Sequence, residues 1–198
     1  MTTQRSLRSS EVPALAFRTG VLALLIVLSI PVFTRGIIQL GDYAGFMHRP
    51  DLVIHEAGHV LFGLFGNELL TVLGGSLLQV LFPFALMVAF VVKNRDFFGA
   101  AVMGWWGGQS IADVAPYIND ARSLQLMLIG GGTGQEFEGH DWEFILGRLG
   151  LLNWDTRLGS VALGVGRLWM ILALLWAGAM ILRQAWKIRG RSGATTPA

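Results

Sequence analysis

The chain has 198 residues, of which 53% are hydrophobic and only 14% are charged, and its formal net charge is +2. Soluble domains carry about 25% charged residues, so this composition argues against an ordinary soluble domain, and the small net charge argues against a nucleic-acid partner. Cysteine is absent. Disulfides and thiolate metal sites are therefore excluded, and any metal must be held by His, Asp or Glu.

Apolar segments separated by polar connections make up most of the chain. A basic start, residues 1–12, precedes an apolar run at 13–33 that could cross about 30 Å of hydrocarbon and is too long for a typical signal peptide. The later apolar segments cover residues 51–66, 69–92, 97–118 and 161–182. Residues 119–160 form the most hydrophilic interior part, and residues 183–198 form a basic tail that we expect to be disordered.

These segments predict an all-α fold, a polytopic membrane protein with about five or six transmembrane or re-entrant helices. Both tails are basic, which places both in the cytoplasm and requires an even number of crossings. One segment is then re-entrant, or residues 142–152 add a short sixth crossing. We expect a single membrane domain over 13–182 in a multi-pass membrane protein.

Residues 55–59 read His-Glu-Ala-Gly-His and fit the motif H-E-x-x-H. Two histidines four residues apart lie on one face of a helix, so His55 and His59 can bind one Zn²⁺ ion. Glu56 then lies beside the open position of the metal, where it can take a proton from bound water and pass it to a leaving amine. Zinc suits this chemistry because it lowers the pKa of its bound water to about 7.

A plainer interpretation is that both histidines are satisfied core residues and that Glu56 pairs with a neighbour. In the centre of a bilayer, however, an ionisable group costs roughly 2.5–3.5 kcal/mol. Three such groups within one helical turn need a shared partner, and a divalent cation supplies one. The motif therefore favours a metal site.

The motif supplies only two of three protein ligands. The extended pattern H-E-x-x-H-x-x-G-x-x-H fails, because Phe62 and Phe65 stand where Gly and His are needed. The candidates for the third ligand are Asp113, Asp120 and His140, with Glu68 as a weaker one.

Asp113 is the first of these candidates and lies at the polar end of segment 97–118. Gln109 precedes it by four residues and Asp120 follows it by seven, so all three could share one helical face. Pro116 is expected to kink or end this helix, which weakens the case for Asp120.

Each candidate also has a role without a metal. Asp113 could be an interfacial carboxylate that pairs with Arg122 or Lys93. His140 lies in a loop, where it could be a surface or substrate-contacting histidine, or a ligand that Asp141 orients.

Two glutamines are candidates for substrate binding. Gln79 lies in the segment after the motif, and Gln109 lies near Asp113. Gln79 could bind a substrate strand or a ligand, or it could simply link helices, since the nearby Gly74 and Gly75 allow close packing.

In the order of these features the chain resembles the site-2 protease family of intramembrane zinc metalloproteases. An H-E-x-x-H segment, a Gly-containing segment and a segment whose polar end carries an Asp near a Pro follow one another over residues 51 to about 122. The resemblance implies that His55 and His59 are zinc ligands and that Glu56 is the general base. It places the chain in a divergent branch of small bacterial membrane proteins, so we expect a multi-pass protein of the bacterial inner membrane with a metal-site core at about 51–122.

In that family the third ligand is an Asp in a later span, usually in an Asn-x-x-Pro…Leu-Asp-Gly context. Asp113 is the closest positional match and Asp120 is the alternative. No Leu-Asp-Gly sequence occurs here, and Pro116 follows Asp113 instead of preceding it.

The function expected from the sequence is a zinc-dependent intramembrane endopeptidase. It would hydrolyse transmembrane or membrane-associated protein substrates with a metal-bound water activated by Glu56. The alternatives are a non-proteolytic membrane protein that binds or transports metal with the same ligands, and a pseudoprotease that binds transmembrane partners. Glu56 favours hydrolysis, because a storage or transport site needs no base beside its histidines.

Overall fold

The computed structural model describes residues 2–193 except 44, 130 and 137. The helices in chain order are α1 (Thr2–Thr34), α2 (Ile37–Tyr43), α3 (His48–Gly63), α4 (Glu68–Ala89), α5 (Phe97–Asn119), α6 (Asp141–Arg148) and α7 (Asp155–Gly193). A π-helical turn (Phe90–Asn94) extends α4, and a 3-10 turn (Leu152–Trp154) precedes α7. Within the described residues the only β-pairing is an isolated bridge between Met127 and Thr133. The predicted all-α fold is confirmed.

Three helices are long and apolar enough to cross a membrane. They cover Glu11–Thr34, Glu68–Asn94 and Leu152–Gly190. The predicted count of five or six is not confirmed. A crossing takes about 20 residues, whereas α3 has 16 residues and α6 has 8. The short crossing predicted at 142–152 is therefore largely the small helix α6.

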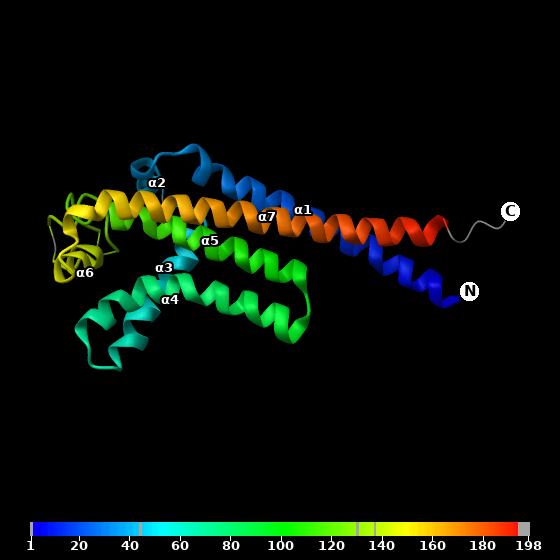
Figure 1. Ribbon diagram of the computed structural model, residues 1–198, viewed down its shortest axis with the longest axis horizontal. Helices are drawn as coiled ribbons and strands as arrows, with labels where there is room; N and C mark the ends of the chain where they lie inside the picture. Colours follow the sequence, from blue (N-terminus) through cyan, green and yellow to red (C-terminus); the bar gives the residue numbers. More distant parts are fainter. Residues whose placement is uncertain (1, 44, 130, 137, 194–198) are drawn as a thin grey trace.

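Helix α5 has the length of a crossing, but its sequence is more polar than the three stretches that could cross a membrane. Its 23 residues extend roughly 35 Å. It lies between α4 and α7, so other helices cover much of its surface (Figure 1). A Cβ atom on Gly108 would lie 2.9 Å from the backbone nitrogen of Met170, and one on Gly166 would lie 2.7 Å from that of Ala112. The glycines of α5 and α7 therefore allow the two backbones to touch.

Helices α1 and α7 pack along each other and carry the two ends of the chain to the same end of the molecule (Figure 1). The opposite end carries α2, α6 and the connection between α5 and α6. The backbone of α7 stays helical to Gly193, through most of the segment expected to be a disordered tail. Arg167 of α7 donates to the carbonyl oxygens of Val32 and Arg35 at 2.9 and 2.7 Å, which caps the end of α1.

Two tryptophans attach the helices that carry the candidate site. Trp106 of α5 donates to the carboxylate of Asp51 at 2.7 Å and so fixes the start of α3. Trp142 of α6 donates to the hydroxyl of Ser76 at 3.1 Å and so fixes α6 against α4. Helices α3, α4, α5 and α6 consequently meet around one region, in which the motif histidines lie.

Candidate metal centre

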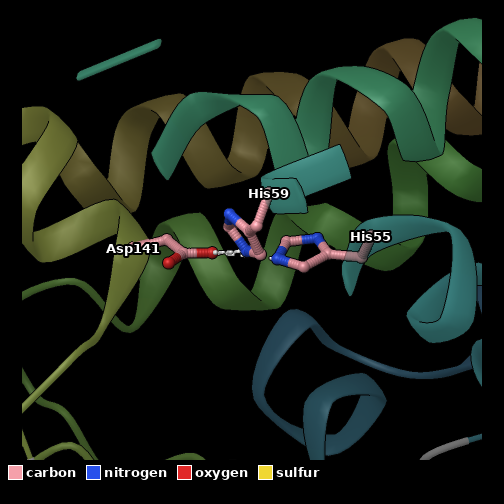
Figure 2. Close-up of side chains that lie close together, drawn as sticks. All are labelled: His55, His59 and Asp141. Carbon is pink, nitrogen blue, oxygen red and sulfur yellow. Dashed lines mark hydrogen bonds and ion pairs between the residues drawn. The ribbon is translucent and has the colours of Figure 1, made fainter. Parts of the chain in front are cut away.

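The structure brings His55 and His59 together, as the motif predicts. They lie one turn apart on α3, and their ring centroids are 4.7 Å apart. The Nε2 atoms of both rings approach the same carboxylate oxygen, Oδ2 of Asp141, at 2.9 Å for His55 and 3.2 Å for His59 (Figure 2). Within the described part of the chain these three residues form a group able to hold a metal ion, with all ligand atoms within 4.8 Å of one another.

The other nitrogen of each ring is held by a carbonyl oxygen. Nδ1 of His55 lies 3.0 Å from Oε1 of Gln79, and Nδ1 of His59 lies 3.0 Å from the backbone oxygen of Thr71. A carbonyl oxygen can only accept, so each Nδ1 carries the proton and donates it. Each Nε2 therefore points at the carboxylate of Asp141, to which it donates when its ring is charged, and it can offer a lone pair to an ion when its ring is neutral.

The orientation of Gln79 is fixed in turn by Asp113. The amide nitrogen of Gln79 donates to Oδ2 of Asp113 at 3.0 Å, so its amide oxygen must face His55. Asp113 also pairs with Nδ1 of His48 at 3.0 Å. Metal-bound histidines commonly donate their second N–H to an oxygen acceptor that sets the tautomer. Here the chain from Asp113 through Gln79 performs that task for His55.

The donor set fits a zinc ion. Two imidazole nitrogens and a carboxylate oxygen at these distances must share a proton or a cation, and nitrogen and oxygen ligands of this kind suit zinc. Ligands at zinc bond lengths in tetrahedral geometry lie roughly 3.3 Å apart. The distances of 2.9 and 3.2 Å from Asp141 to the two histidines are close to that spacing.

Glycines leave the space that an ion would need. A Cβ atom on Gly75 of α4 would lie 2.5 Å from Nε2 of His59 and 2.6 Å from Nε2 of His55. A methyl group there would fill the volume beside both nitrogen atoms. On α3, one turn after His55, a Cβ atom on Gly58 would collide with the carbonyl group of Gly74. The glycines thus let α4 pass directly over the face of α3 that carries the histidines.

Asp141 is the first residue of α6, and its surroundings fix it in place. Its backbone N–H donates to the hydroxyl oxygen of Tyr117 at 3.0 Å. Burial raises the pKa of the Asp141 carboxyl, but the neighbouring His55 and His59 more than offset this and hold that pKa below its usual value. The carboxylate is therefore ionised and available as an anionic ligand.

The predicted third ligands lie elsewhere. Asp113 contacts His48 and Gln79, and is not among the three residues that form the candidate site. Asp120 accepts the backbone N–H groups of Gln125 and Leu126 and so holds the turn after α5. This replaces the expected ligand choice: the carboxylate beside the histidine pair is Asp141.

His140, the other alternative, is the N-cap of α6. Its Nδ1 accepts the backbone N–H of Glu143 at 3.2 Å, and its Nε2 lies 3.4 Å from Oδ2 of Asp120. Burial lowers the pKa of His140, which favours the neutral ring with its proton on Nε2. The cap uses the remaining lone pair. His140 thus positions Asp141 and has no lone pair left for a metal ion. Glu68, the weaker candidate, lies exposed in the first turn of α4.

A cavity of about 800 Å³ opens onto the site. Its lining includes the three ligand candidates and apolar side chains of the segment 126–129. Glu56 is exposed to this cavity, and within the described residues its carboxylate makes no hydrogen bond or ion pair. Gln79 also lines it, with its amide engaged by His55. Gln109 instead lines a separate cavity of about 160 Å³.

No protein-family model, curated protein sequence or solved structure matches the chain. Its class is therefore defined by its own fold and site: an all-helical chain with three helices able to span a membrane and a His55–His59–Asp141 group that could hold a metal ion.

The two aspartates should differ sharply when each is replaced by asparagine. Asp141→Asn removes a charged ligand, so zinc affinity should fall by more than the roughly 10- to 100-fold that loss of an orienting partner costs. Asp113→Asn should cost about 10-fold, because it acts only through Gln79. Competition titration with a chelator on detergent-purified protein measures both. An equal or larger loss in Asp113→Asn would contradict the assignment of Asp141 as the ligand.

Proposed function

We propose that this protein is a zinc-dependent intramembrane endopeptidase. The observation that carries the proposal is the convergence of the Nε2 atoms of His55 and His59 and the Asp141 carboxylate on one point. Glu56, whose carboxylate has no partner among the described residues, lies beside them in an open cavity. Catalytic zinc sites have three protein ligands and keep a further position free. A purely structural site has no need of a cavity or of a free carboxylate.

Zinc bound by these residues would acidify a water molecule and polarise the carbonyl group of a peptide. Glu56 follows His55 directly and has no other partner in the part of the chain that the structure describes, so it can accept a proton from that water. As water oxygen adds to the carbonyl carbon and the peptide C–N bond breaks, Glu56 returns the proton to the leaving amine. The second proton of the water passes from the new carboxylic acid to the amine, so the products are a carboxylate and an ammonium group, and Glu56 is again an unprotonated carboxylate.

The surroundings of the site support a substrate from the membrane. Large apolar side chains of α1 and α7 are exposed, with Phe17 at 72% and Leu175 at 66%, as expected of lipid-facing helices. Met127 and Ile129, which line the cavity, are also largely exposed. A transmembrane segment with a locally unwound helix could therefore place an apolar stretch against them and its carbonyl group near Glu56.

We propose an orientation in the membrane from the positions of the two ends of the chain. Three crossings alone would leave the ends on opposite sides, whereas α1 and α7 bring them to the same end (Figure 1). We propose that α5 is a fourth crossing. The basic residues Arg183, Lys187 and Arg189 then lie in the cytoplasm of a bacterium, and α6 faces the other side of the inner membrane.

The resemblance to site-2 proteases supports the proposal for His55, Glu56 and His59. It does not extend to the third ligand, because Asp141 comes from a short helix after a polar connection and not from a membrane span. We therefore propose a divergent arrangement of the same chemistry.

The wild-type protein tests this function directly. Purified in detergent, it should contain about one zinc ion per chain and cleave transmembrane peptides within their apolar segments, as detected by mass spectrometry. Removal of zinc by a chelator should stop cleavage, and addition of zinc should restore it. Zinc-loaded protein that leaves a broad panel of such peptides intact would contradict the proposal.

A further inference from the structure

Tyr117 lies beside the candidate metal centre without being a ligand. It is half-buried near the end of α5 and lines the same cavity as Glu56 and the three ligand candidates. Its ring centroid lies 4.3 Å from that of His140 and 6.2 Å from that of His55. The phenol ring is therefore held between the cap of α6 and the first histidine of the motif.

The hydroxyl group of Tyr117 accepts one hydrogen bond, but its own proton is not used in a hydrogen bond within the described residues. The oxygen accepts the backbone N–H of Asp141 at 3.0 Å. Within the described part of the chain no acceptor for the phenolic proton is found. A hydroxyl group can accept and donate at once, so this proton is available to a molecule in the cavity.

The Tyr117 hydroxyl lies next to Asp141, where it can donate a hydrogen bond to a bound peptide. The carboxylate of Asp141 faces the two histidines, and its backbone nitrogen holds the Tyr117 hydroxyl. A peptide carbonyl that reaches the histidine pair must therefore come close to the phenol. A phenol is neutral at pH 7 and donates without adding charge to the site.

We propose that Tyr117 is a catalytic residue that hydrogen-bonds the carbonyl oxygen of the scissile peptide as negative charge develops on it. The proposal rests on the endopeptidase function proposed above. When water oxygen adds to the carbonyl carbon, the electron pair of the C=O bond moves onto the carbonyl oxygen. The Tyr117 O–H donates to that oxygen and keeps its own proton, while Glu56 takes the proton of the water. The C=O bond re-forms as the C–N bond breaks.

Such a donor is recognised by its effect on the transition state. Loss of one donor to a developing oxyanion costs about 10²- to 10³-fold in kcat. Tyr117→Phe should therefore lower kcat by that factor and leave KM nearly unchanged. Zinc content should match that of the wild type, because all three ligands remain.

Two further measurements separate catalysis from positioning. A peptide phosphinate, whose tetrahedral anion imitates the charged carbonyl, should bind Tyr117→Phe about 10²-fold more weakly, whereas an uncleaved peptide should bind with unchanged affinity. Tyr43→Phe is the matched control, since Tyr43 is the only other tyrosine and stacks under the guanidinium of Arg35 outside the main cavity. It should behave as the wild type in every assay.

A kcat for Tyr117→Phe within about threefold of the wild type, or an undiminished phosphinate affinity, would overturn the proposal. Loss of zinc from Tyr117→Phe would also overturn it, because the residue would then only hold Asp141. Failure of the proposed endopeptidase function would be seen in the wild-type protein, which would then cleave no peptide. The two failures are therefore distinguishable.

Discussion

Glu56→Gln should lower kcat for peptide hydrolysis by roughly 10²- to 10⁴-fold while zinc remains bound. The amide has nearly the shape of the carboxylate but cannot accept a proton from water. Glu56 is exposed to the cavity and makes no hydrogen bond or ion pair within the described residues, so its replacement should not disturb the fold. Zinc content and cleavage of a transmembrane peptide are measured on the same preparation.

Glu68→Gln is the matched control, because Glu68 is an exposed carboxylate at the start of α4 outside the cavity. Its kcat should equal that of the wild type. The Glu56 variant also separates the three functions considered for this chain. Cleavage at the wild-type rate in Glu56→Gln would exclude Glu56 as the base. A wild-type protein that binds zinc and transmembrane peptides without cleaving them would be a metal-binding protein or a pseudoprotease.

Gly75→Ala should weaken zinc binding by about 100-fold or more, although no ligand is changed. The new methyl carbon would lie 2.5 Å from Nε2 of His59 and 2.6 Å from Nε2 of His55, well inside van der Waals contact. The imidazoles must rotate away, which turns their lone pairs from Asp141. Alanine also favours a helix more than glycine does, by up to about 1 kcal/mol, so α4 itself should persist. Zinc content and chelator competition measure the effect.

Two other glycines serve as controls for this substitution. A Cβ atom on Gly164 of α7 meets nothing within 4 Å, so Gly164→Ala should leave zinc binding unchanged. A Cβ on Gly74 would lie 2.6 Å from Cβ of Phe62, which strains the contact of α3 with α4 without touching the histidines. Zinc affinity that falls equally in Gly74→Ala and Gly75→Ala would show that helix packing, and not space at the ligands, decides the loss.

The histidine pair was predictable because its geometry is local. A spacing of four residues on a helix is sufficient to bring His55 and His59 together. The free-energy cost of several ionisable groups in an apolar segment indicated a shared partner. Asp141 was not predictable in the same way. It lies 86 positions from His55, beyond a polar connection, and spacing carries no information over that distance. The available signal was the neighbouring His140, which suggested Asp141 only as a residue that orients a histidine ligand.

Asp113 shows why a polar residue in an apolar helix is an ambiguous signal. Its burial in a helical bundle does require partners, as the sequence suggested, but those partners are His48 and Gln79. It orients His55 through the amide of Gln79. Sequence patterns identify that a carboxylate needs a partner and do not distinguish a metal from a hydrogen-bond donor.

The helical class was evident from composition, whereas the number of crossings was not. Apolar runs such as 51–66 and 142–152 resemble crossings in sequence, yet α3 and α6 are short helices that pack against others. Helix α5 poses the opposite problem, because a helix covered by its neighbours can be long and still carry Trp, Gln and Asp. Tertiary packing, which hydropathy does not report, decides both cases.

The placement of Asp141 also has a mechanical consequence for a chain without cysteine. An ion held by His55, His59 and Asp141 would join α3 to α6 across 86 positions, and no disulfide can do this here. Closing so long a loop restricts the unfolded chain, so the ion would act as a removable cross-link. The wall of the cavity formed by 126–129 lies within that loop. Loading with an ion would thus tie this wall of the cavity to α3 in a single step.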